Sequence, residues 1–353
     1  MLMIAGIKAS SMTGKDCKKG SAAGGQGKLR VLPKQQSDRL TYALGKSSFM
    51  DSPSSIPASK SPTMLKPVFP LITFAWACSF GAILAAEEEI QVEKNLVYAT
   101  KDKKDLKLDA YLPTSKGPKP SVLVIHGGGW MSGSKWQLGR YAAALAKRGV
   151  NTFAINYRLA PKYKHPAQVE DCRDAVRWVR KNSRKYGGDP KRIGALGYSA
   201  GAHLAAMLAV TGMNAKEDPK GIGTEVLVAV GGGTPCEFLS LHPDNKAMAY
   251  WLGGSRKQFQ KVYKDASPIS HLDAKDSPIF FFHGEVDGLV RASGARDMSR
   301  KMEKLGIDTK FHLIKDAGHF AAVFNLKAFE AGFDFLEKHL QVKQGTANKR
   351  KKK

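Results

Sequence analysis

Arg192–Ala206 reads RIGALGYSAGAHLAA, and this stretch decides the fold class. The apolar run IGAL leads into the GxSxG sequence Gly197–Gly201, and an alanine-rich apolar segment follows. Small residues around the serine are what a sharp turn from a buried strand into a helix requires. GxSxG alone is weak evidence, because the chain holds 35 glycines among 353 residues and a chance match is not rare. Its context therefore predicts a strand, a tight turn with Ser199 at the apex, and a helix.

On both sides of this stretch, short apolar runs alternate with amphipathic segments. This alternation predicts an α/β fold with a mainly parallel central sheet, helices on both faces and a small insertion at 235–277. Residues 91–100 and 105–113 alternate in polarity and predict an opening hairpin. The expected later strands are 121–126, 151–157, 191–199, 225–233, 277–285 and 309–316, and the expected helices are 134–149, 166–187, 200–212, 295–306 and 324–340.

The two ends of the chain differ in composition from its centre. Residues 1–63 are rich in Ser, Gly, Pro and Lys, which indicates a disordered leader or a misassigned start. Residues 64–86 follow the pattern of a secretory signal peptide, which predicts an exported protein with a mature N-terminus near Ala86 or Glu87. A membrane anchor and a lipid-modified Cys78 are the alternatives. The hydrolase-like pattern then occupies 87–341, and a basic, disordered tail is expected at 342–353.

Charge and cysteine content exclude several classes of function. The net charge is +25, but no basic patch interleaved with aromatic residues is present, so nucleic acid is not an expected partner. The basic tail predicts only a weak contact with polyanions. The four cysteines have no CxxC spacing, which argues against a zinc site or a disulfide framework. We expect neither a metal nor an organic cofactor.

A serine at such a turn becomes nucleophilic only when a base accepts its proton and a carboxylate orients that base. In a strand–turn–helix hydrolase the partners follow in the order Ser, acid, His. His319 lies in a glycine-containing loop after an expected strand, and Glu285 and Asp287 follow another. We favour His319 as the base and Asp287 as the acid. His203, one helical turn after Ser199, is expected to be a packed neighbour.

Several motifs in one order resemble the α/β-hydrolase esterases of the hormone-sensitive-lipase type, and more closely bacterial secreted lipase/esterase (carboxylesterase) proteins. The motifs, within 105–340, are HGGGW, NYRLAP, HPAQVEDCRDAVRWV, YGGDPKRIGALGYSAGAHLAA, ASPISHLDAKDSPIFFFHGEVDGLV and AGHF. The resemblance implies that Ser199, Asp287 and His319 form the catalytic triad. It also implies that Gly127, Gly128 and the N–H of Ala200 form the oxyanion hole, which accounts for the run of glycines at 127–129.

The expected function is that of a serine carboxylesterase acting on small or short-chain acyl esters, free or linked to a polysaccharide. Trp130 and Tyr198 are candidate residues of the substrate pocket, although positions in the core would explain them equally well. An arylformamidase or amidase on the same triad is the alternative among enzymes, since relatives of that kind also use an HGGxW loop. A catalytically silent hydrolase fold that serves as a binding module is the alternative from another class. The sequence does not indicate the oligomeric state.

Overall fold

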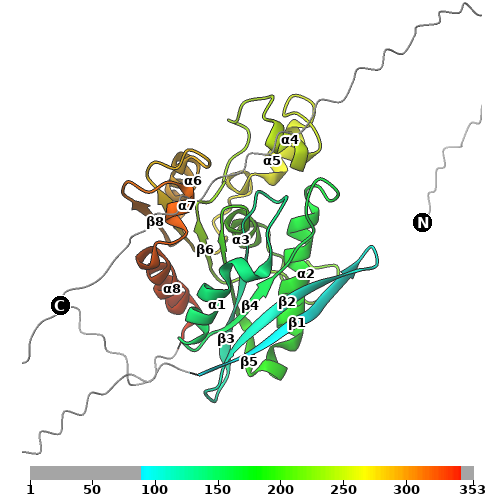
Figure 1. Ribbon diagram of the computed structural model, residues 1–353, viewed down its shortest axis with the longest axis vertical. Helices are drawn as coiled ribbons and strands as arrows, with labels where there is room; N and C mark the ends of the chain where they lie inside the picture. Colours follow the sequence, from blue (N-terminus) through cyan, green and yellow to red (C-terminus); the bar gives the residue numbers. More distant parts are fainter. Residues whose placement is uncertain (1–88, 343–353) are drawn as a thin grey trace, which may run out of the picture. The chain divides into compact units, whose positions relative to one another are not determined.

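A computed structural model of the protein describes residues 89–342 (Figure 1). The predictions for the leader, the signal peptide and almost all of the basic tail concern residues outside this range. Within 89–342, no helix is long and apolar enough to cross a bilayer.

The centre of the described chain is one eight-stranded sheet in the order β1-β2-β4-β3-β5-β6-β7-β8. The first two strands form the predicted hairpin, and β2 pairs antiparallel with β4. Every later pair is parallel, so the mainly parallel sheet is confirmed. The strands are β1 (Ile90–Lys101), β2 (Lys104–Pro113), β3 (Lys119–Ile125), β4 (Asn151–Ile155), β5 (Gly188–Tyr198), β6 (Ala229–Gly232), β7 (Ile279–Gly284) and β8 (Thr309–Ile314).

Helices cover both faces of this sheet (Figure 1). They are α1 (Gly139–Ala146), α2 (Ala167–Asn182), α3 (Ala200–Thr211), α4 (Lys246–Leu252), α5 (Gln260–Ala266), α6 (Ala292–Lys304), α7 (His319–Ala322) and α8 (Leu326–Leu340), with short 3₁₀ turns η1 (Lys135–Leu138), η2 (Ser183–Tyr186) and η3 (Pro268–Ser270). The predicted insertion at 235–277 contains α4, α5 and η3. Strand β6 has four residues, five fewer than the strand expected at 225–233.

Alternate residues of the central strands enter two separate apolar cores. In β3, Leu123 and Ile125 point to the core beneath α2, α3 and α6, whereas Val122 and Val124 point to the core beneath α1 and α8. Successive side chains of a strand face opposite sides of the sheet, so a strand that is covered on both sides must be apolar throughout. All seven residues of β3 are accordingly buried. This double covering fixes the carboxyl ends of β3, β5, β7 and β8 at one edge of the sheet.

Candidate active site

Ser199 lies at the tight turn between β5 and α3, as the sequence predicts. Its backbone has φ 55° and ψ −121°, a conformation that residues with a side chain rarely adopt. Two glycines make the turn possible, because a Cβ on Gly201 would lie 2.0 Å from the Ile125 carbonyl oxygen and one on Gly197 2.2 Å from the Gly201 oxygen. The Ser199 N–H donates to the Gly232 carbonyl at 2.8 Å. The turn therefore holds the serine at the edge of the sheet, above the start of α3.

The structure brings His319 and Asp287 to this serine, although the three residues are far apart in the sequence. The Nε2 atom of His319 lies 2.9 Å from Ser199 Oγ, and its Nδ1 atom lies 2.6 Å from Asp287 Oδ2. An ionised carboxylate can only accept hydrogen bonds, so Nδ1 carries the proton and Nε2 is left to accept the serine hydroxyl. We refer to these three side chains as the Ser–His–Asp group.

Asp287 is held by more hydrogen bonds than the one from His319. Its Oδ1 accepts the backbone N–H groups of Leu289 at 3.0 Å and Val290 at 2.8 Å. Nε2 of the buried His283 lies 3.3 Å from Oδ2 and 2.8 Å from the Val290 carbonyl oxygen. Burial raises the pKa of the Asp287 carboxyl, but the hydrogen bonds from His283 and His319 outweigh it and hold that pKa well below its usual range. Asp287 is therefore ionised at neutral and mildly acidic pH.

His283 belongs to this site as well, although it was not among the residues predicted from the sequence. The sequence feature that could have identified His283 is its position at the end of the buried strand β7, four residues before Asp287. The other acid candidate, Glu285, is exposed and accepts the N–H of Asp316 at 3.1 Å.

His203 lies in a buried position with both ring nitrogens occupied. The Trp130 indole N–H donates to its Nδ1 at 3.2 Å, so Nε2 carries the proton and donates to the Ala266 carbonyl at 2.7 Å. Neither nitrogen is free to accept a proton from Ser199. His203 instead connects three elements: the loop after β3, helix α3 and the insertion.

The loop after β3 passes directly beside the serine. A Cβ on Gly127 would lie 3.3 Å from Ser199 Cβ and 3.0 Å from the Tyr198 carbonyl oxygen. Gly128 has φ 108°, and its carbonyl accepts the N–H groups of Met131 and Ser132. Glycine is required at this point, because its Cβ would lie 2.2 Å from the Ser132 carbonyl oxygen. Ala200 is the first residue of α3, where the backbone N–H groups have no carbonyl partner within the helix.

His126 and Tyr157 support this loop from below. Their rings stack with centroids 4.2 Å apart, and the Tyr157 hydroxyl donates to the His126 carbonyl at 3.0 Å. The His126 Nδ1–H donates to the Gly127 carbonyl at 2.7 Å. The loop therefore has a fixed position relative to Ser199.

The two candidate pocket residues, Trp130 and Tyr198, are buried and only 3% and 5% exposed. Trp130 stacks on Trp251 of α4, with ring centroids 3.7 Å apart and planes at 2°, and Phe238 closes the cluster. The Tyr198 hydroxyl donates to the His319 carbonyl. Both side chains thus pack behind the Ser–His–Asp group.

Exposed apolar side chains lie on the two segments that carry Asp287 and His319. Val286 and Leu289 lie in the loop that carries Asp287, and Phe320 and Phe324 follow His319. The guanidinium of Arg140, at the start of α1, lies over the Phe324 ring at 5.0 Å. Exposed apolar patches of this kind are common at ligand-binding sites. We call these four apolar side chains the apolar rim.

Two buried histidines near the site predict a loss of stability in mild acid. Burial lowers the pKa of His126 to about 4 and that of His203 to about 3. Below the ordinary pKa of about 6.5, the unfolded chain takes up these protons and the folded chain does not, so stability falls as the pH falls toward 4. Between pH 7 and 5 we expect each histidine to cost about 2 kcal/mol of unfolding free energy. Asp287 contributes nothing in this window, since its carboxyl is ionised in both states.

Urea unfolding of the parent and of His203→Asn at pH 7 and pH 5 measures this effect. Between these two pH values the variant is expected to lose about 2 kcal/mol less unfolding free energy than the parent. Equal pH dependence in the two proteins would contradict the assignment to His203.

The sequence of this chain is similar to those of known ester hydrolases. The BD-FAE family model matches residues 108–302. A probable carboxylic ester hydrolase, LipM, of Mycobacterium tuberculosis is 33% identical over 200 residues, which are 53% of this chain and 46% of that protein. The esterase LipC of the same organism is 30% identical over 64% of this chain and 55% of its own length. The chain thus spans about half the length of the curated relatives it matches.

Solved structures share the fold. A truncated carbohydrate esterase from gut microbiota has a TM-score of 0.66 at 24% identity, covering 73% of this chain and 99% of that one. Esterase 2 of Thermogutta terrifontis has a TM-score of 0.59 at 28% identity, covering 72% and 93%. It has also been solved with propionate bound, with butyrate bound and phosphonylated by sarin.

Proposed function

The chain belongs to the BD-FAE family, and from this premise we propose that it is a serine carboxylesterase that hydrolyses short-chain acyl esters. It has the α/β-hydrolase fold, and the resemblance to esterases of the hormone-sensitive-lipase type is confirmed by the relatives. The observation that carries the proposal is the continuous hydrogen-bonded path from Ser199 Oγ through the His319 ring to Asp287, at 2.9 and 2.6 Å.

In the proposed reaction, Ser199 Oγ attacks the ester carbonyl and His319 Nε2 takes its proton. His319 then gives this proton to the departing alkoxide, which leaves as the alcohol. The acyl group stays bonded to Ser199 Oγ as an acyl-enzyme. Water attacks the acyl-enzyme with the same histidine as base, and the acid is released. The Asp287 carboxylate holds the imidazole with Nδ1 protonated and stabilises the positive charge that the ring gains.

The oxygen of the tetrahedral intermediate carries a negative charge that must be stabilised. We assign this role to the N–H groups of Gly127, Gly128 and Ala200, which belong to the two segments adjoining Ser199. Donors held in place before the reaction stabilise such a charge without reorganising. The hydrogen bonds of His126 and Tyr157 to this loop support the assignment, since they fix its position.

Two observations support short acyl groups as substrates. A relative of 27–28% identity binds propionate and butyrate. The apolar rim provides a surface for a small apolar group beside Ser199. The likeness to a carbohydrate esterase concerns the fold alone, so a polysaccharide-linked ester is part of the proposal and depends on the test below.

Labelling with a fluorophosphonate, followed by peptide mapping, tests the proposal. We expect one labelled residue, Ser199, as well as turnover of acetyl, propionyl and butyryl nitrophenyl esters. Acetylated xylan, assayed beside them, tests the polysaccharide-linked substrate. Hydrolysis of an N-formyl aromatic amide without any ester turnover would favour the formamidase alternative. Absence of labelling in the folded protein would favour a silent binding module.

Gly127→Ala tests the assigned oxyanion loop. The new Cβ would press on Ser199 Cβ and the Tyr198 carbonyl, so the loop must move by a few tenths of an ångström. We expect kcat for a soluble ester to fall about tenfold or more with little change in KM, because misplaced donors weaken the transition state more than substrate binding. Steady-state kinetics and a melting curve measure this. A raised KM at unchanged kcat would mean that the loop only binds substrate.

We also propose that residues 64–86 direct export and are removed. The motivation is their apolar run between Lys66 and the acids that follow Ala86. N-terminal sequencing of the protein from its native host tests this, with Ala86 or Glu87 as the expected first residue. A mature chain that retains Val68–Ala86 in the membrane fraction would support an anchor instead.

A further inference from the structure

A hollow of about 370 Å³ lies on the flank of the domain, between the end of β1, the middle of α2 and the loop after α3. It shares no residue with the Ser–His–Asp group. Its lining combines cationic side chains with aromatic ones, namely Lys101, Arg177, Lys181 and Lys220 together with Tyr98 and Trp178. The carboxylate of Asp174 lies among them. We call this hollow the flank pocket.

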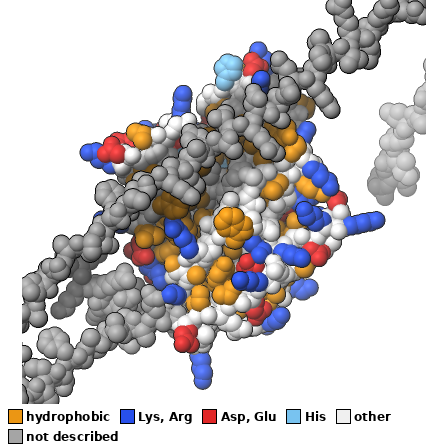
Figure 2. Space-filling view, viewed as in Figure 1, with side chains coloured by type: hydrophobic (Ala, Val, Ile, Leu, Met, Phe, Trp, Pro, Cys, Tyr) orange, Lys and Arg blue, Asp and Glu red, His pale blue; other side chains and the backbone are white. Residues whose placement is uncertain are grey.

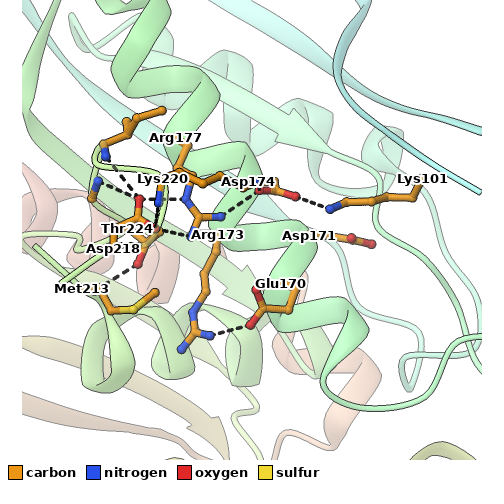
Figure 3. A network of polar contacts seen from close by, with 12 residues as sticks. Lys101, Glu170, Asp171, Arg173, Asp174, Arg177, Met213, Asp218, Lys220 and Thr224 are labelled. Carbon is orange, nitrogen blue, oxygen red and sulfur yellow. Dashed lines mark hydrogen bonds and ion pairs between the residues drawn. The ribbon is translucent and has the colours of Figure 1, made fainter. Parts of the chain in front are cut away.

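Asp174 is the centre of a network that joins the three walls of the pocket (Figure 3). Lys101 reaches it from β1 at 2.7 Å, Arg177 contacts it within α2 at 2.8 Å, and Lys220 reaches it from the loop at 2.6 Å. Arg177 also makes two hydrogen bonds to Asp218, at 2.7 and 2.9 Å. The walls therefore have fixed positions before any ligand arrives.

The charges of this network do not balance. Three cations, Lys101, Arg177 and Lys220, face the two carboxylates of Asp174 and Asp218, which leaves one positive charge. Lys181 is exposed and has no carboxylate partner within residues 89–342, which adds a second. Burial raises the pKa of Asp174, but Lys101 and Lys220 outweigh it, and Arg177 lowers the pKa of Asp218, so both acids are ionised at neutral pH.

The surplus positive charge lies on exposed side chains, which a ligand could contact. The Lys220 side chain is 54% exposed, although Asp174 already has Lys101 and Arg177 as partners. An exposed ion pair contributes little to stability, so the fold does not depend on the contact of Lys220 with Asp174. Trp178 lines the same hollow, and its partner rings, Phe153 and Tyr186, hold it in place.

We propose that the flank pocket binds an acidic saccharide, with the anionic group between Lys181 and Lys220 and the sugar ring against Trp178. An anion supplies the missing negative charge. The C–H bonds of a sugar ring are weakly positive and pack against the negative face of an indole. The volume lies within the range of small-ligand sites. The site is separate from the Ser–His–Asp group, so this inference goes beyond the proposed esterase activity.

Calorimetric titration of the full chain with a trimer of galacturonate tests the proposal. The parent is expected to bind, and a neutral galactose trimer is not. Lys181→Ala/Lys220→Ala is expected to bind the acidic trimer about tenfold more weakly or worse, since two charge contacts are lost. The matched control is Lys301→Ala/Lys304→Ala on α6, which removes the same charge from exposed positions and is expected to bind like the parent. All three proteins keep the basic tail, so its attraction for polyanions is the same in each.

A sulfated trimer distinguishes the source of the negative charge. If the parent binds the sulfated trimer and the Lys181→Ala/Lys220→Ala variant does not, the site accepts acidic sugars in general. If the parent binds the galacturonate trimer but not the sulfated one, the site is specific for carboxylates. Equal weakening in both double variants would overturn the proposal, since it would mean attraction by overall charge. The proposal would also be overturned if the folded parent bound neither the galacturonate trimer nor the sulfated trimer. Ester turnover is not part of this readout, so a failed titration leaves the esterase proposal intact.

Discussion

His319→Ala is expected to lower kcat for a soluble short-chain ester by about 10⁴–10⁶-fold. Without the imidazole, nothing at 2.9 Å from Ser199 Oγ can take its proton, and the departing alkoxide has no acid to protonate it. Asp287 would keep its hydrogen bonds from Leu289 and Val290 but would have no imidazole to orient. Hydrolysis of nitrophenyl butyrate, followed over hours with a large excess of enzyme, measures a loss of this size.

The control for this prediction is His203→Asn, with the parent as reference. The amide oxygen of Asn takes the place of Nδ1 and can still accept from Trp130, whereas the bond of Nε2 to Ala266 is lost. Neither contact involves Ser199, so a modest fall in kcat is expected. A loss as large as that of His319→Ala, in a variant that melts like the parent, would show that the wrong histidine has been assigned as the base.

Gly201→Ala is expected to have the largest effect on stability. Its Cβ would lie 2.0 Å from the Ile125 carbonyl oxygen and 2.5 Å from that of His126. Both atoms are backbone and cannot rotate away, so α3 would have to separate from β3. We expect a loss of more than about 4 kcal/mol of unfolding free energy, which is near the upper limit for single substitutions.

Gly288→Ala is the matched control, because no atom lies within 4 Å of its added Cβ and its φ is not in the left-handed region. Urea unfolding of both variants at neutral pH gives the comparison. Equal stability of Gly201→Ala and the parent would mean that α3 does not lie against β3 as described.

The element order of this fold was predictable from sequence, because strands covered on both faces must be apolar throughout and the helices between them amphipathic. β3 is the clearest case. The proximity of Ser199, Asp287 and His319 was predictable for a related reason: the carboxyl ends of parallel strands meet at one edge of the sheet.

Side-chain directions were less predictable. Trp130 was a candidate for the pocket and equally for the core. Its ring is buried and stacks on Trp251, 121 residues later in the chain. The contact of His283 with Asp287 depends likewise on how the acid loop folds back. Local sequence does not encode such long-range contacts in a readable form.

The stack of Trp130 on Trp251 has a consequence for protein engineering. Exchanging the insertion at 235–277 between related enzymes is an attractive route to new specificity, since this segment interrupts an otherwise regular fold. A donor insertion that lacks an indole at the position of Trp251 would leave Trp130 without its stacking partner and next to a void. The glycine loop that Trp130 anchors would then lose its support, so the chimaera would fail in catalysis even with a well-fitting substrate. Productive chimaeras must exchange both sides of this contact together.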